Sequence, residues 1–108
     1  MNLVVKMDIN EIQSRIVDFA KKRAKAKNFE DNAELTFIHL AEELGEVARQ
    51  LTSKKMRPDL FNNENLKEEI VDVILESLIL AHQCNVNLDE EINKKIDALY
   101  KKHGFSKD

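Results

Sequence analysis

The sequence predicts an all-α protein, a small antiparallel four-helix bundle, and two observations lead to this fold class. The chain has 108 residues with only two glycines and one proline, whereas all-β folds need many turns that use these residues. Apolar residues also recur at helical spacing along most of the chain. A chain of this length normally forms one domain, so we expect residues 1–108 to be a single all-α domain.

The first two predicted helices begin with the same capping pattern, an aspartate followed three residues later by a glutamate. Asp8 opens the first helix, which we expect over about residues 8–27. Asp31 opens the second helix, which we expect over about residues 31–53. Pro58 lies in the break that follows, because proline cannot continue a helix.

The last two predicted helices are separated by a short turn at residues 85–87. The third, over about residues 64–83, is apolar around much of its circumference, so we expect it to be the central helix. The fourth is opened by Asn87, and short connections of this kind make neighbouring helices antiparallel. A domain this small, with so apolar a helix, is expected to self-associate as a homodimer or homotetramer.

The bulk composition argues against several classes of protein. A net charge of −3 argues against a duplex nucleic-acid binder, which usually has a basic excess. No apolar run approaches the ~20 residues needed to cross a membrane, and residues 1–6 lack the long apolar stretch of a secretory signal. The single cysteine, Cys84, is expected to be a buried free thiol. These features predict a cytoplasmic protein that binds neither nucleic acid nor membrane.

An acidic heptapeptide occurs twice, at residues 40–46 and at residues 66–72. Each copy reads leucine, any residue, two glutamates, an aliphatic residue, any residue and an acid. At about 100° per residue, the second glutamate and the final acid of each copy lie beside the apolar stripe of their helix. Antiparallel packing through these stripes is expected to bring four carboxylates to one edge of the interface: Glu43, Glu46, Glu69 and Asp72.

These acids lack the basic partners that a solvated helix face normally has. In the fourth helix, Glu90 and Glu91 each have a lysine four residues later, the ordinary arrangement for an exposed face. The repeated motif has no lysine or arginine at that spacing, and only Arg49 follows Glu46 three residues later. Clustered carboxylates repel one another and need cations to offset the repulsion. Mg²⁺ is the natural candidate, because it prefers oxygen ligands and keeps waters for substrate phosphates.

The two motifs resemble the signature of the MazG family of all-α nucleoside triphosphate pyrophosphohydrolases, E-E-x-x-E followed at a distance by E-x-x-D. The matching stretches are residues 42–46 and 69–72, with 22 residues between them. The resemblance implies a MazG-like helical fold and Mg²⁺-dependent hydrolysis of a nucleoside triphosphate to a monophosphate and pyrophosphate. It also implies a role in clearing unwanted nucleotides from the cellular pool.

The resemblance also implies roles for individual acids. Glu42 is implied to be an outer acid or a ligand for a further ion. Either Glu42 or Glu46 is the candidate to accept the proton of the attacking water, and the sequence does not decide between them. The implied Mg²⁺ ligands are Glu43, Glu46, Glu69 and Asp72.

Candidates for substrate contact lie near the acids and in basic stretches. His39 precedes the acids by one helical turn, where a substrate contact and no role at all are equally compatible with the sequence. One or two basic residues of the loop after the acidic helix or of the last helix are expected to neutralise phosphate. Lys54 and Lys95 are the candidates named from these two groups, and their spacing does not decide which residue acts. A basic run at residues 21–27 is interpreted as a solvated helix end, which the helix dipole favours.

There are three other interpretations of the acids. A ferritin-like di-iron bundle also uses inward glutamates, but it normally has Glu-x-x-His pairs, and no histidine here has a glutamate three residues before it, so this interpretation is weak. A phosphoribosyl-ATP pyrophosphohydrolase, from the same superfamily, would keep the metal site and change the substrate. A non-enzymatic helical interaction module would instead expose the acids to a basic partner and need no Mg²⁺. Thermal stability measured with and without Mg²⁺ separates that module from either enzyme.

Overall fold

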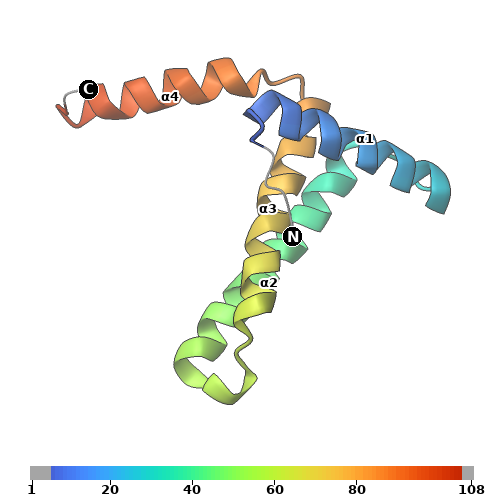
Figure 1. Ribbon diagram of the computed structural model, residues 1–108, viewed down its shortest axis with the longest axis vertical. Helices are drawn as coiled ribbons and strands as arrows, with labels where there is room; N and C mark the ends of the chain where they lie inside the picture. The colour runs from blue at the N-terminus through green and yellow to red at the C-terminus, as the bar shows by residue number, and fades with distance from the viewer. Residues whose placement is uncertain (1–5, 106–108) are drawn as a thin grey trace.

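The computed structural model describes residues 6–105 and confirms the all-α fold class (Figure 1). Within these residues there is no strand. Residues 1–5, which carry most of the segment expected to lack a secretory signal, lie outside the described part. The helices are α1 (Ile9–Lys27), α2 (Ala33–Met56), the short 3₁₀ helix η1 (Pro58–Leu60), α3 (Asn63–Gln83) and α4 (Leu88–Lys102).

Two of the predicted helix starts are confirmed. The Asp8 carboxylate accepts a hydrogen bond of 2.8 Å from the backbone N–H of Glu11 at the start of α1. The Asn87 side chain accepts one of 3.2 Å from the backbone N–H of Glu90 at the start of α4. Each bond satisfies an N–H group that no helical carbonyl reaches in the first turn.

The start of α2 differs from the prediction. Asn32, rather than Asp31, is the N-cap, and its side chain accepts a hydrogen bond of 2.9 Å from the backbone N–H of Leu35. The Asp31 carboxylate instead accepts a hydrogen bond of 2.8 Å from the side chain of Gln83, at the end of α3. Because Asp31 is engaged with another helix, the next side chain performs the capping. The helix also runs past the predicted end to Met56, two residues before the proline.

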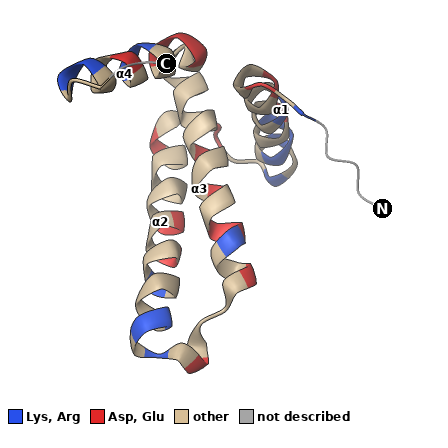
Figure 2. Ribbon diagram, turned by 60° about the vertical axis from the view of Figure 1, so that its left-hand side comes forward, with Lys and Arg blue, Asp and Glu red and all other residues tan. Residues whose placement is uncertain are grey.

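Helices α2 and α3 form an antiparallel hairpin and lie side by side in both views (Figures 1 and 2). The Gln50 side chain near the end of α2 accepts a hydrogen bond of 2.9 Å from the backbone N–H of Asn62, the N-cap of α3. On its other side α3 contacts α1, where the Gln13 side chain donates a hydrogen bond of 2.9 Å to the Leu78 carbonyl. Helix α3 is therefore central, as predicted.

Helix α4 extends away from the hairpin and contacts α1 rather than lying along α2 and α3 (Figure 1). Its apolar side chains recur on one face and are 38–46% exposed. Within one chain, this face is uncovered. The residues concerned are Ile92, Ile96, Leu99 and Tyr100.

The buried core lies where α1 crosses α3. The apolar side chains that are buried there come from three residues of α1 and two of α3. Small side chains on α1 allow the two helices to approach closely. The buried apolar residues are Val17, Ala20, Ala24, Leu78 and Ile79.

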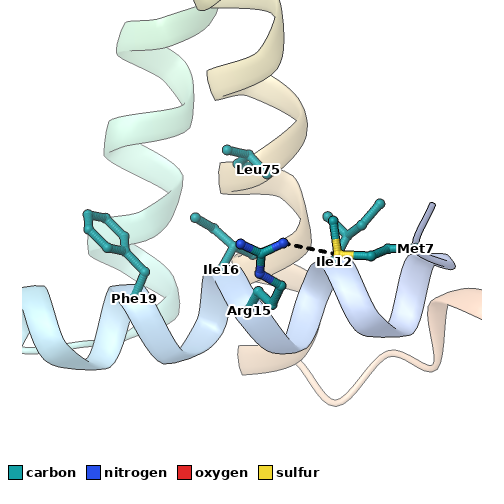
Figure 3. Close-up of a pocket in the computed structure, with 6 residues that line it drawn as sticks. All are labelled: Met7, Ile12, Arg15, Ile16, Phe19 and Leu75. Atoms are coloured by element: carbon teal, nitrogen blue, oxygen red, sulfur yellow. Dashed lines mark hydrogen bonds between the residues drawn. The ribbon is translucent and has the colours of Figure 1, made fainter. Parts of the chain in front are cut away.

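Much apolar surface remains uncovered elsewhere. Large apolar side chains on the hairpin are exposed, among them Phe37 at 59%, Leu44 at 51% and Ile74 at 53%. An open pocket of about 340 Å³ also lies between α1 and α3, and Figure 3 shows Arg15 reaching across its mouth to the sulfur of Met7. Exposed apolar side chains in such numbers are typical of an interaction face. The pocket is lined by Met7, Ile12, Arg15, Ile16, Phe19 and Leu75.

The expected burial of Cys84 is wrong, because the thiol is exposed. Cys84 is the C-cap of α3, past the last turn that packs on α1, and the chain leads away from the core at that point (Figure 1). Among the described residues, the helices lack the combined length and apolar character that crossing a membrane requires.

Shortening the Ile79 side chain should test the location of the core. Ile79 is only 2% exposed, so Ile79→Ala should lower the free energy of unfolding by about 2–5 kcal/mol, and Ile79→Val by about 0.5–1.5 kcal/mol. Urea titration followed by circular dichroism measures both values. Equal and small losses for the two variants would show that the α1–α3 contact is not the core in solution.

Candidate metal centre

Three carboxylates from the two acidic heptapeptides meet across the α2–α3 contact. Glu69 and Asp72 are three residues apart and therefore lie on the same side of α3. Glu43 lies opposite them on α2, and one carboxylate oxygen from each of the three residues is within 4.8 Å of the other two. Glu43 and Glu69 are half-buried, whereas Asp72 is exposed. Acidic positions follow both helices of the hairpin in Figure 2. We call Glu43, Glu69 and Asp72 the acidic trio.

The surroundings of Glu43 in the acidic trio raise the pKa of its carboxyl. The pKa of Glu43 is raised from its ordinary value of 4.5 to about 7. The main cause is a hydrogen bond with the Glu69 side chain, followed by burial and by the negative charges of Asp72, Glu69 and Glu76. Near neutral pH, a proton therefore takes part of the role that a cation would take.

The donor set of the acidic trio fits a hard divalent cation. Carboxylate oxygens are the ligands that Mg²⁺ prefers, and three of them leave coordination positions for water and phosphate oxygens. The Glu43 carboxyl, whose pKa is raised, hydrogen-bonds with the Glu69 side chain, and a cation bound at the trio would displace the proton from Glu43. The electrostatics and the ligand chemistry of the trio therefore agree.

Glu46, the fourth predicted ligand, is not part of the trio. Its carboxylate forms an ion pair of 3.1 Å with Arg49 one turn later, and its side chain is 42% exposed. Glu42, the predicted outer acid, is exposed on the same helix. The structure thus brings together three of the four predicted ligands, and the roles of Glu46 and Glu42 stay predictions.

The predicted substrate contacts lie at different places on the fold. His39 is half-buried on α2, one turn before Glu43. Lys54 lies near the end of α2 with its ammonium 5.5 Å from the ring centroid of Phe61. Lys95 is exposed on α4, which does not lie along the hairpin. Of the three, only His39 is within one turn of a trio member along its helix.

Sequence reasoning did not assign two charged residues that lie next to the trio. Glu76 follows Asp72 by one turn on α3, and its charge contributes to the raised pKa of Glu43. Arg23, on α1, approaches Glu76 to 3.7 Å and has a side chain only 26% exposed. The interpretation of the basic run as solvated is therefore wrong for Arg23. The row Glu69, Asp72 and Glu76 was a signal in the sequence, whereas nothing near Arg23 pointed to α3.

Replacing Glu43 should change how metal-free stability depends on pH. The folded-state pKa of Glu43 is above its unfolded value, so its protonation stabilises the fold below about pH 4.5, and this contribution is lost as the pH rises through about 7. Across this window, the melting temperature of the parent in EDTA should fall relative to that of Glu43→Gln, which keeps the hydrogen bond and cannot ionise. Parallel melting curves for the two proteins would contradict the raised pKa.

Comparison with known proteins assigns the chain to a family. The family model for the MazG nucleotide pyrophosphohydrolase domain matches residues 31–105. This stretch contains the hairpin, the acidic trio and α4. No curated protein matches the chain. The match extends over more than half of the sequence and confirms the resemblance carried by the two acidic motifs, so the chain belongs to the MazG nucleotide pyrophosphohydrolase family.

Proposed function

We propose that this protein hydrolyses a nucleoside triphosphate to a monophosphate and pyrophosphate with Mg²⁺ held by the acidic trio. The observation that carries the proposal is the approach of three carboxylates to within 4.8 Å on the MazG-type hairpin. As part of the same proposal, the protein acts in the cytoplasm to remove unwanted nucleotides. The proposal also includes that the protein binds neither nucleic acid nor membrane.

Glu46 is proposed as the fourth ligand. It lies one turn after Glu43 on the same helix, and its present partner is the exposed Arg49, whose side chain is 70% accessible. Exposed ion pairs of this kind contribute little to stability. Breaking the Glu46–Arg49 ion pair would therefore cost little, and the Glu46 carboxylate would be available to a divalent cation at the trio.

The chemistry of the proposal divides between the cation and the protein. Mg²⁺ bound here would polarise the phosphoryl group and lower the pKa of a bound water. Glu42 or Glu46 would accept the proton of the attacking water on a carboxylate oxygen. His39 would contact the substrate, and Lys54 would neutralise phosphate charge. Lys95 has the same proposed role, and because α4 projects from its own hairpin, it would serve the site of a second copy.

Neutral replacements in the trio should abolish hydrolysis while leaving the fold intact. Glu43→Gln and Asp72→Asn each keep side-chain size and remove one of several repelling charges. Without Mg²⁺, the free energy of unfolding should therefore be unchanged or slightly higher. Each also weakens Mg²⁺ binding, which stabilises charge developing on the phosphates by several kcal/mol. We expect turnover to fall by about 100-fold or more. Pyrophosphate release is measured on a panel of nucleoside triphosphates and phosphoribosyl-ATP.

The matched control is Glu91→Gln on α4. Glu91 pairs with Lys94 at 3.4 Å on an exposed face, so its replacement should change stability by only a few tenths of a kcal/mol and leave turnover unchanged. Trio variants that hydrolyse as fast as the parent would refute the metal site. A preference for phosphoribosyl-ATP would change the substrate and keep the site. A parent that hydrolyses nothing and does not respond to Mg²⁺ would favour the interaction module.

A second copy of the chain is the proposed partner for the uncovered apolar face of α4. We expect a homodimer or homotetramer by light scattering, because burying this face and the exposed side chains of the hairpin would remove a large apolar area from water. Ile96→Glu, in the middle of the α4 stripe, should shift the protein towards the monomer. Lys101→Glu, on the polar face of α4, should not. A monomeric parent at working concentration would refute this assembly.

A further inference from the structure

An ion pair between α1 and α3 lies beside the acidic trio. Nη2 of Arg23 is 3.7 Å from Oε1 of Glu76, and the two side chains are only 26% and 13% exposed. Five other ion pairs among the described residues have side chains at least 42% exposed. The Arg23–Glu76 pair is therefore less hydrated than any of those five.

Glu76 is placed to act on the acidic trio. It lies one helical turn after Asp72 and two turns after Glu69, which puts all three on one side of α3. Its negative charge is one of the causes that raise the pKa of Glu43 across the helix contact. Glu76 is thus a further negative charge, beyond the proposed ligands, within electrostatic reach of the proposed cation.

The geometry of the Arg23–Glu76 pair is poor for stabilising the fold. Nε of Arg23 and Oε2 of Glu76 are buried and have no hydrogen-bond partner, and 3.7 Å is too long for a strong charge-assisted hydrogen bond. The guanidinium lies instead over the ring of Phe19, 5.4 Å from its centroid. Buried ion pairs with unsatisfied atoms often stabilise a fold less than apolar residues of the same size. We therefore look for the role of this pair in its electrostatic effect on the neighbouring acids and not in its contribution to fold stability.

We propose that Arg23 and Glu76 are positioning residues of opposite sign that set the Mg²⁺ affinity of the acidic trio. The inference rests on the proposed function, because it requires the trio to bind Mg²⁺. Glu76 strengthens binding by adding a negative charge beside the trio. Arg23 weakens it by offsetting the charge of Glu76, so that the site does not hold the cation as tightly as it would beside an uncompensated Glu76 carboxylate.

The two residues should have opposite effects on cation binding. The Kd for Mg²⁺ is measured by isothermal titration calorimetry on the full chain without nucleotide. Arg23→Met keeps the apolar stem and removes the positive charge, so the Kd should fall by about threefold or more. Glu76→Gln removes the negative charge, so the Kd should rise by about threefold or more. The double variant should return close to the parent value, because the two charges cancel.

Two controls separate charge from structure. Arg23→Lys loses the guanidinium contact with Phe19 but keeps the positive charge, so its Kd should stay within about twofold of the parent if charge is what matters. Lys22→Met removes the neighbouring charge, which is 76% exposed and pairs with Asp18, and should leave the Kd unchanged because solvent screens it. If Arg23→Met fails to fold by circular dichroism, the expected weakening in Glu76→Gln and the unchanged Arg23→Lys remain decisive.

The outcomes distinguish this inference from the function on which it rests. A parent that binds no Mg²⁺ overturns the proposed function, and the inference with it. A parent that binds Mg²⁺, with Arg23→Met and Glu76→Gln shifting the Kd in the same direction or not at all, overturns the inference alone. Opposite shifts that cancel in the double variant support it, because damage to the fold would weaken binding in both single variants.

Discussion

Electrostatic repulsion within the acidic trio is the constraint around which the hairpin is arranged. Antiparallel packing of α2 against α3 half-buries Leu40 and Val47, and the same packing brings Glu43, Glu69 and Asp72 within 4.8 Å of one another. Like charges at such separations destabilise each other, and the hydrogen bond with Glu69, burial and the neighbouring negative charges together raise the pKa of Glu43 to about 7. Apolar packing therefore holds these carboxylates close together, and a proton or a cation is needed to reduce the repulsion among them.

Helix α1 adds to the hairpin both buried apolar contact and a positive charge that reaches Glu76. Ala20 and Ala24 are 2% and 5% exposed where α1 crosses α3. Arg23 lies between them in sequence, about 60° around the helix from Ala20, so its long side chain runs along α3 to Glu76. The close approach that the small alanines permit is thus also what places the guanidinium near the acids.

Helical periodicity was sufficient to predict the trio but not its surroundings. Glu43, Glu69 and Asp72 lie on adjacent antiparallel helices joined by a short connection, so spacing alone determined that they meet. The Glu46 carboxylate pairs with Arg49 and does not join the trio. Helical periodicity places a residue on one side of its helix but does not say with which neighbour its side chain pairs. The burial of Arg23 depends on which face of α1 meets α3, and a run of basic residues carries no information about that contact.

The orientation of α4 marks where prediction from one chain ends. Its cap at Asn87 and its apolar stripe were both readable, because each is a local property of the sequence. The apolar stripe, however, predicts only that this face is buried. It does not tell whether the face packs on the hairpin of its own chain or on that of another copy. The direction of α4 is set by the preceding turn, where Asn85 adopts a left-handed φ of 58°, and by contact with α1. The metal ligands within the hairpin were therefore within reach of the sequence, whereas any part of the site that depends on a second copy was not.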